Sequence, residues 1–401
     1  MLLPPGADRS AGRLLFSRAL RGLADGYVAI LLPAYLFALG LGTWEVGVLA
    51  SATLFGSALA TLAVGAWGHR FHGRWLLGAA AVLMALTGFG FAAAASFWPL
   101  LVVAFVGTLN PSSGDVSVFL PLEHARLANA AGGPARTALF ARYSLTGALF
   151  AALGALAAGL PDALTVWAGI SRLDALRAMF LMYGLIGAAL WVLYRGLPES
   201  PQASSERLTP LGPSRTIVLR LAALFCVDSF AGGLAVNALL ALWLFQRFDL
   251  SLAAAGAFFF WAGLCSALSQ LAAPRLAGRI GLVNTMVFTH IPASLCLIAA
   301  AFVADVRVAL GLMLLRALLS QMDVPARGAF VMSVVTPGER AAAASFTAVP
   351  RSLAAAAGPG LGGAMFAAGW LAAPLVACGV LKIAYDVALW RAFRHTPVGG
   401  D

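Results

Sequence analysis

The stretch "GLPESPQASSERLTPLGPSR", residues 196–215, is the one long polar segment in a chain that is otherwise strongly apolar. It is rich in Pro and Ser and begins where a helix would stop, which is typical of a linker. We therefore predict an N-terminal bundle over residues 1–196, a cytoplasmic linker over 197–215 and a C-terminal bundle over 216–401.

The composition predicts that both halves lie in a lipid bilayer. Of 401 residues, 61% are hydrophobic and only 10% are charged, whereas soluble chains carry roughly 25% charged residues. One span needs about 20 apolar helical residues. Segments of this kind lie near residues 14–39, 46–67, 75–95, 98–120, 138–160, 176–196, 216–245, 252–273, 283–303, 308–332, 341–367 and 371–393. The predicted fold class is an all-α polytopic membrane protein with twelve transmembrane helices in two pseudo-symmetric six-helix bundles.

The arginines predict which way the chain crosses the membrane. If both termini lie on one face, that face receives eighteen arginines and the other receives only Arg172, Arg177, Arg247 and Arg307. Positive charge favours the cytoplasmic side, so we expect both termini in the cytoplasm of a bacterial-type inner membrane. The net charge of +10 then reflects membrane orientation, and no nucleic-acid partner is expected.

Several features recur in the second half at a near-constant offset of about 203 to 209 residues. This predicts a parallel repeat about an axis along the membrane normal. The matching features are Asp25 with Asp228, Arg70 with Arg279, Arg136 with Arg340, and the trio Thr108, Ser112 and Asp115 with Arg316, Ser320 and Asp323.

A short basic turn follows the second helix of each half, "GAWGHRFHGR" at residues 65–74 and "PRLAGRIG" at residues 274–281. With the six-plus-six pattern and the linker, these turns make the chain similar to the major facilitator superfamily, whose turn reads G-x-x-x-D-[RK]-x-G-[RK]-[RK]. The first copy has one inserted residue, and His69 and Gly278 replace the family's Asp, so the role of that Asp is not carried over. The resemblance implies gating turns at Gly65, Arg70, Gly73, Arg74, Arg279 and Gly281.

The segment "AAAAGPGLGG", residues 354–363, resembles the family's A-x-x-x-G-P-x-x-G-G motif. In the family this motif marks antiporters when it lies in helix 5, whereas here it lies in the symmetry-related helix 11. Gly358, Gly362 and Gly363 allow a neighbouring backbone to approach, and Pro359 removes a backbone hydrogen bond. Tight packing and a hinge both fit this pattern.

Charged and polar side chains inside the spans are the candidates for substrate binding or proton coupling, because a charge there costs at least about 2.5 to 3.5 kcal/mol. Asp25 follows Arg21 by one helical turn, which fits either a coupling role or an interfacial pair. Asp228 has no partner nearby in sequence and fits either coupling or a structural hydrogen bond. The full set is Asp25, Asp115, Asp228, Asp323, Arg142, Arg316, Arg351, Ser320, Asn110 and Asn237.

Helix 10 carries Arg316, Ser320 and Asp323 as one polar stripe. Because such a stripe does not face lipid, it is expected either to line a cavity or to bond to another helix. Arg142 and Arg351 are expected either to neutralise an aspartate or to bind an anionic substrate.

The resemblance implies a secondary transporter that works by alternating access. The intramembrane carboxylates favour proton coupling, and we predict efflux of a small organic solute by a monomer. The alternatives are a divalent metal-ion or other solute facilitator, and a membrane sensor that transports nothing. We expect no enzyme, cofactor or metal site, because the sequence has no nucleotide-binding loop, nucleophile elbow or H-E-x-x-H motif. His290 is expected to be a core histidine.

Overall fold

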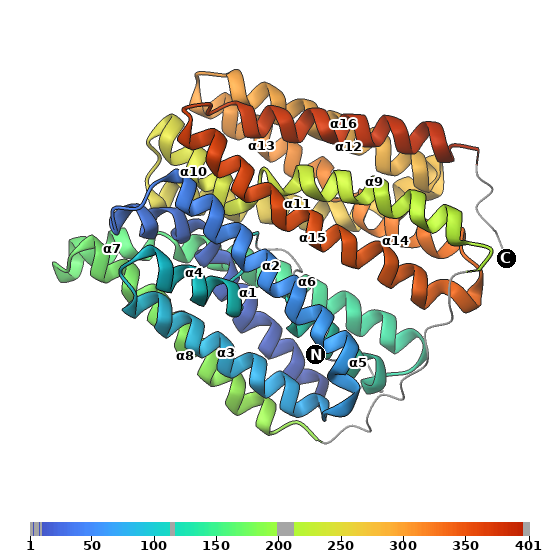
Figure 1. Ribbon diagram of the computed structural model, residues 1–401, viewed down its shortest axis with the longest axis horizontal. Helices are drawn as coiled ribbons and strands as arrows, with labels where there is room; N and C mark the ends of the chain where they lie inside the picture. The colour runs from blue at the N-terminus through green and yellow to red at the C-terminus, as the bar shows by residue number, and fades with distance from the viewer. Residues whose placement is uncertain (1–2, 4–7, 9, 113–116, 199–211, 396–401) are drawn as a thin grey trace. The chain divides into compact units, whose positions relative to one another are not determined.

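The computed structural model describes residues 3, 8, 10–112, 117–198 and 212–395, which form helices and no strand (Figure 1). Up to residue 198 the helices are α1 (Ser10–Ala38), α2 (Thr43–Trp67), η1 (Gly68–Arg70), α3 (Gly73–Ala93), α4 (Phe97–Val106), α5 (Phe119–Ala130), α6 (Gly133–Ala157), α7 (Leu160–Ala168) and α8 (Arg172–Arg195). From residue 212 they are α9 (Arg215–Gly233), α10 (Asn237–Phe248), α11 (Leu252–Ile280), α12 (Leu282–Phe302), α13 (Val306–Ser320), α14 (Asp323–Ser333), η2 (Pro337–Glu339), α15 (Arg340–Ala367) and α16 (Ala373–Phe393).

The helices match a polytopic membrane protein. In the described part of the chain, 10 helical segments are long and apolar enough to cross a membrane. The 28-residue α15 and the segment formed by α4 and α5 fall outside that set and account for the two remaining predicted spans. The all-α fold class with twelve spans is therefore confirmed.

Three predicted spans, 98–120, 216–245 and 308–332, are each interrupted in the structure. Pro111 and Pro325 indicate the first and third breaks from the sequence, and only the second is unexpected. The first break lies beside Pro111, and the third lies just before α14, where Pro325 occupies the first helical turn. Proline is tolerated in a first turn because the N–H groups there have no intrahelical partner. The second break follows Gly233. Breaks inside spans free backbone groups that protein or water must satisfy.

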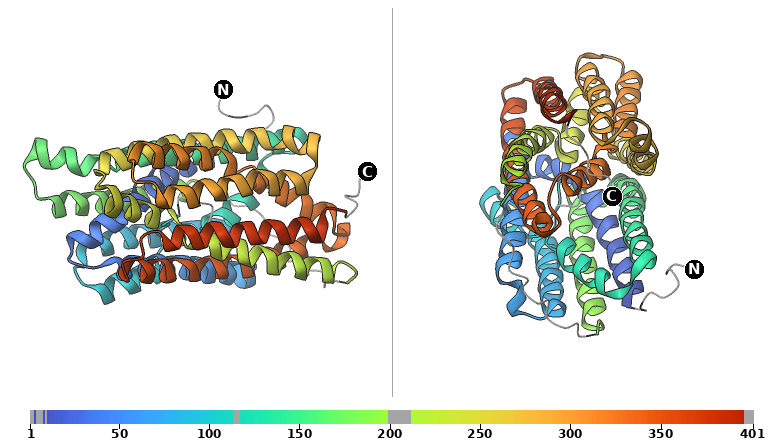
Figure 2. Two further views of the ribbon diagram at one scale, coloured as in Figure 1. Left: turned by 90° about the horizontal axis from the view of Figure 1, so that it is seen from above. Right: turned by 90° about the vertical axis from the view of Figure 1, so that its right-hand side faces the viewer.

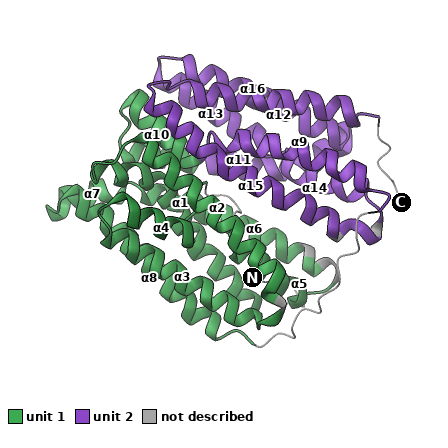
Figure 3. Ribbon diagram, viewed as in Figure 1, with its two compact units in different colours: residues 1–205, 237–260 green, residues 206–236, 261–401 purple. Residues whose placement is uncertain are grey.

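The chain divides into two compact units (Figure 3). Unit 1 contains residues 1–205 and 237–260, and unit 2 contains residues 206–236 and 261–401. In unit 1, α1 packs on α6 and α3 packs on α8; in unit 2, α9 packs on α15 and α12 packs on α16. Within each unit these helices run close to parallel or antiparallel (Figure 2). The units thus repeat one pairing of helices, as an internal duplication predicts.

Glycines allow the closest of these helix contacts. A Cβ atom on Gly358 of α15 would lie 2.5 Å from the Cα atom of Gly233 on α9. At the equivalent pair in unit 1, a Cβ atom on Gly154 of α6 would lie 2.1 Å from the carbonyl oxygen of Leu23 on α1. Larger residues at these positions would force the helices apart, because real Cβ atoms do not approach so closely.

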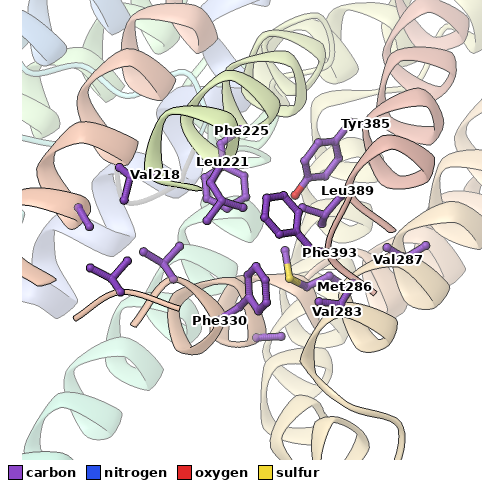
Figure 4. Close-up of a cluster of buried hydrophobic side chains, with 14 residues drawn as sticks. Val218, Leu221, Phe225, Val283, Met286, Val287, Phe330, Tyr385, Leu389 and Phe393 are labelled. Carbon is purple, nitrogen blue, oxygen red and sulfur yellow. The ribbon is translucent and has the colours of Figure 1, made fainter. Parts of the chain in front are cut away.

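Unit 2 has an apolar core of buried side chains (Figure 4). Phe225 comes from α9, Met286 from α12, Phe330 from α14, and Tyr385 and Phe393 from α16. The core joins the short helix α14 to three long helices. This packing fixes the position of α14, whose first two turns carry charged side chains.

Candidate functional site

Unit 2 contains a cavity of about 130 Å³ between α9, α12, α13, α14 and α16. Arg316 lies roughly 15 Å along α13 and Lys382 roughly 14 Å along α16, at a rise of 1.5 Å per residue. The cavity is therefore near the middle of spans that cross about 30 Å of hydrocarbon. Six lining residues are charged or titratable, namely Asp228, His290, Arg316, Asp323, Arg327 and Lys382.

Asp228 of α9 is the centre of the charged network. Lys382 Nζ donates to Asp228 Oδ1 over 2.6 Å, and Arg327 Nη1 donates to Oδ2 over 3.0 Å. His290 Nε2 lies 4.0 Å from Oδ1. Asp228 is only 5% exposed, so its charge is compensated by these side chains, as a buried carboxylate requires. Its partners come from three other helices.

His290 of α12 joins this network to a second carboxylate. Its Nδ1 lies 3.1 Å from Asp386, which is fully buried on α16, and its Nε2 lies 3.3 Å from Lys382 Nζ. An ammonium group only donates hydrogen bonds. With Lys382 charged, Nε2 therefore accepts, and Nδ1 carries the proton that is donated to Asp386. His290 is buried, but both of its nitrogens face charged groups.

Arg327 of α14 bridges two carboxylates. Its guanidinium lies 3.0 Å from Asp228 and 3.6 Å from Asp323, which is one turn earlier on α14. The same guanidinium lies over the ring of Phe225, 5.5 Å from its centroid. Arg327 therefore connects the charged network to the apolar core of unit 2, and the break before α14 places both Asp323 and Arg327 at the cavity.

Unit 1 has a buried polar cluster at its centre. Glu123 of α5 accepts hydrogen bonds from Arg21 of α1, Tyr143 of α6 and Tyr194 of α8. Glu123 is fully buried and Arg21 is 2% exposed. Four helices therefore meet at one carboxylate. The ion pair joins the first helix of unit 1 to α5, as Asp228 and Arg327 join α9 to α14 in unit 2, with the signs of the charges exchanged.

The structure places some of the sequence candidates together and leaves others apart. Arg316, Ser320 and Asp323 of the predicted helix 10 stripe all line the unit 2 cavity with Asp228. Arg351 is half-buried on α15, near enough to Asp228 and Asp323 for electrostatic interaction. Asp115 lies outside the described residues.

The remaining candidates lie in unit 1. Asp25 is buried on α1, one turn from the Arg21 that pairs with Glu123, and Arg142 is half-buried on α6. Asn110 is buried and accepts from the Ser112 hydroxyl over 2.7 Å at the break after α4. Asn237 is the first residue of α10. These four residues are not part of the cavity.

The predicted gating turns lie at helix junctions. Gly65 lies near the end of α2, Arg70 ends η1, and Gly73 and Arg74 begin α3. A Cβ atom on Gly73 would lie 3.7 Å from Arg126 Nε of α5. Arg279 lies at the end of α11, and Gly281 has a φ of 85°, a conformation that favours glycine.

The helix 11 motif lies in the middle of α15, which continues through Pro350 and Pro359 as one helix. Gly358 faces Gly233, and Gly362 and Gly363 are buried. These contacts are those of tightly packed helices.

Sequence reasoning missed four charged residues of these networks, besides the two tyrosines that donate to Glu123. Lys382 and Asp386 stand one turn apart in "LKIAYDVALW", residues 381–390, inside a predicted span. Charges inside an apolar helix are a signal that could have identified them. Arg327 and Glu123 lie near predicted cytoplasmic ends, where charged residues are ordinary, so the sequence carries little signal for their burial.

Among the described residues, no group of three or more His, Cys, Asp or Glu side chains is placed to hold a metal ion.

Comparison with known proteins places this geometry in a family. A sequence profile described as Major Facilitator Superfamily matches residues 14–315. The chain is 22% identical to an uncharacterized membrane protein of Saccharomyces cerevisiae, over 96% of this chain and 94% of the other. It is 32% identical to a D-xylose transporter of Levilactobacillus brevis over 146 residues, which are 35% of this chain and 32% of the other.

Two solved structures share the fold at low identity. The nucleoside transporter NupG has a TM-score of 0.74 and 14% identity, covering 97% of this chain and 100% of the other. A D-xylose-proton symporter has a TM-score of 0.74 and 16% identity, covering 95% and 97%.

Proposed function

The chain belongs to the Major Facilitator Superfamily, and from that premise we propose that it is a secondary transporter that moves a small organic solute across a membrane by alternating access. The observation that carries this proposal is the charged network around Asp228, at the cavity in the middle of the unit 2 spans. Burying this many ionised groups costs free energy, so their presence at this depth indicates a function. A sensor without transport has no need of titrating groups at this depth.

We propose that protons drive the transport, and that His290 is the coupling group. A proton added at Nε2 turns this nitrogen from an acceptor into a donor. The cation Lys382 then faces another cation at 3.3 Å, so the contact becomes repulsive. Asp228 Oδ1, 4.0 Å from Nε2, becomes the natural partner of the protonated ring. Proton uptake therefore transfers Asp228 from Lys382 to His290 and frees the Lys382 ammonium.

Other ionisable groups surround His290, and they influence whether Asp228 pairs with Lys382 or with His290. Asp386 accepts from Nδ1 on the side of the ring away from Lys382. Arg327 holds the second oxygen of Asp228 throughout. The groups around this site are Asp228, Arg316, Asp323, Arg327, Lys382, Tyr385 and Asp386.

The membrane and the orientation are also proposals. The eighteen arginines on one predicted face support cytoplasmic termini in a bacterial-type inner membrane, and we propose that the monomer is the working unit. The orientation is tested by adding a single cysteine at one terminus of the chain at a time and labelling it in intact cells with a reagent that does not cross the membrane. The same reagent reaching both termini from outside the cell would contradict it.

Flux in liposomes tests the transport proposal. Purified protein is reconstituted, a pH gradient is imposed, and accumulation of labelled D-xylose, uridine, gluconate, benzoate and glycerol 3-phosphate is measured beside gradient-free exchange. We expect at least one solute to accumulate in response to the gradient. Absence of accumulation and of exchange for all five would contradict the proposal. Efflux stays a prediction, which the same liposomes test by comparing the two gradient polarities.

Matched histidine variants test the coupling group. In His290→Gln we expect gradient-driven accumulation to be lost while exchange continues, because solute still binds. The control is His72→Gln, because His72 is exposed before α3, and it should behave as wild type. Undiminished accumulation by His290→Gln would remove this residue from the coupling mechanism.

A further inference from the structure

Arg316 differs from the other charged residues that line the unit 2 cavity. Asp228 pairs with Lys382 and Arg327, and Arg327 also pairs with Asp323. Arg316 has no hydrogen bond or ion pair with any residue that the structure describes. Its electrostatic neighbours are the thiols of Cys296 and Cys378, which do not neutralise a guanidinium. The cavity therefore has one cation without a counterion.

Ser294 is a second group at this cavity without a partner. Its side chain lies on α12, the residue is 2% exposed, and its hydroxyl makes no hydrogen bond to any described residue. A buried hydroxyl without a partner costs about 1 to 3 kcal/mol. Ser294 and Arg316 line the same cavity. Two hydrogen-bond donors that have no acceptor among the described residues thus border one space near the middle of the spans.

The charge count of the lining agrees with an anionic ligand. Arg316, Arg327 and Lys382 are cations, whereas Asp228 and Asp323 are the carboxylates that line the cavity with them. With His290 neutral, these lining residues alone carry one positive charge in excess, and Asp386, which bonds to His290, is not among them. A guanidinium matches the planar, bidentate geometry of carboxylate and phosphate groups. Cation binding at Arg316 would increase the excess instead of removing it.

We infer that the transported solute is an organic anion whose carboxylate or phosphate group binds Arg316 and Ser294 in the unit 2 cavity. This inference rests on the proposed transport function, because only that function makes the bound anion a transported solute. A volume of about 130 Å³ is close to that of a cavity that holds benzene, so it admits the charged end of a small metabolite. Release of Lys382 by the protonation of His290 would supply a second cation to the same anion.

Matched pairs of compounds test the inference through binding. The probes are benzoate with benzamide, gluconate with glucose, and glycerol 3-phosphate with glycerol, each added to the purified full chain in detergent at constant ionic strength. The readout is the shift of the unfolding temperature with probe concentration. We expect an anion to raise the unfolding temperature and its neutral counterpart to have no such effect. The carboxylate and phosphate pairs distinguish the two anionic groups.

Variants then locate the anion. Arg316→Gln should weaken anion binding by about 10- to 100-fold, the range expected for a charged hydrogen-bonded contact, and Ser294→Ala by about 5- to 10-fold. Arg307→Gln is the control, because Arg307 is exposed at the start of the same helix. Arg316→Lys keeps the charge without the bidentate geometry and should fall between wild type and Arg316→Gln. It also serves if Arg316→Gln does not fold.

Each outcome decides the inference. Equal stabilisation by the neutral compounds, undiminished anion binding in Arg316→Gln, or no anion effect on wild type would overturn it. Anion binding without flux in liposomes would leave the anion site standing and contradict the transport proposal. Flux of a neutral solute without anion binding would support the transport proposal and contradict the anion site.

Discussion

Lys382 of α16 and Asp228 of α9 form a 2.6 Å ion pair at the cavity of unit 2. The Lys382 side chain is 12% exposed and that of Asp228 is 8% exposed. At this burial each charge depends on the other, since removing Asp228 leaves Lys382 without its ion-pair partner and removing Lys382 leaves Asp228 with Arg327 alone. The pair also joins the first helix of unit 2 to the last, so it is both a packing contact and a candidate element of the transport cycle.

A double-mutant cycle should measure this dependence. Asp228→Asn leaves Lys382 and Arg327 facing a neutral amide, and Lys382→Met leaves Asp228 with only part of its compensation. Each single variant is expected to lose about 3 to 5 kcal/mol of stability. The double variant should lose less than the sum of the two, with a coupling of about 1 to 3 kcal/mol. Thermal unfolding in detergent measures all four proteins, and strict additivity would contradict a direct pair.

Glu123 should be the most sensitive position of the unit 1 cluster. Glu123→Gln leaves the buried guanidinium of Arg21 without its direct ion-pair partner, at a cost of about 3 to 5 kcal/mol. Tyr194→Phe removes one donor and should cost about 1 kcal/mol. The control is Asp174→Asn, because the Asp174 side chain is 60% exposed and its pair with Arg177 is worth at most about 1 kcal/mol. The unfolding temperature should be lowest for Glu123→Gln, higher for Tyr194→Phe and highest for Asp174→Asn. A Glu123→Gln protein as stable as Asp174→Asn would refute the predicted importance of Glu123.

The sequence predicts the helices better than it predicts their partners. Long apolar runs identify the spans, and Pro111 and Pro325 mark two of the three breaks. The third break, after Gly233, contains no proline, and a glycine at that point also fits a continuous helix. Local sequence therefore carries no clear signal for it.

The sequence predicts only part of the candidate site, because the partners of its charged residues are decided by tertiary packing. Arg316 and Asp323 stand out because they interrupt an apolar run, and the cavity contains both. Lys382 gives the same signal, but its pairing with Asp228 joins residues far apart in the chain and depends on how α9 packs against α16. Glu123 was missed because α5 continues past the expected end of its span. Burial at a helix end is decided by tertiary packing.

Gly358 should tolerate no side chain. In Gly358→Ala the new Cβ atom would lie 2.5 Å from the Gly233 backbone, so α9 and α15 must separate and lose contacts along their length. We expect a lower unfolding temperature and a lower yield of monodisperse protein. Gly311→Ala is the control, because a Cβ atom there meets nothing within 4 Å, and alanine in a helix should raise stability by about 0.5 to 1 kcal/mol. Equal behaviour of the two variants would contradict tight packing at Gly358.

Glu339 should make the stability of unit 2 sensitive to acid. Its carboxylate, in the turn between α14 and α15, accepts hydrogen bonds from Ser214, Thr336 and the backbone amide of Gly212, at the start of α9. These bonds lower the pKa of Glu339 from 4.5 to about 2. Because the folded state has the lower pKa, the contribution is complete above about pH 4.5 and is lost as the pH falls towards about 2.

Glu339→Gln tests this sign, because glutamine does not titrate. Unfolding temperatures of wild type and variant are compared in detergent from about pH 6 to about pH 3. Wild type should be the more stable protein at the upper end, and the difference should shrink as the pH falls, since protonation removes the charge that the amide already lacks. Glu45→Gln is the control, because Glu45 lies in the first turn of α2 and its one hydrogen bond among the described residues is from the Gly42 amide. A difference between wild type and Glu339→Gln that stays constant over this range would show that the Glu339 charge does not hold the start of α9.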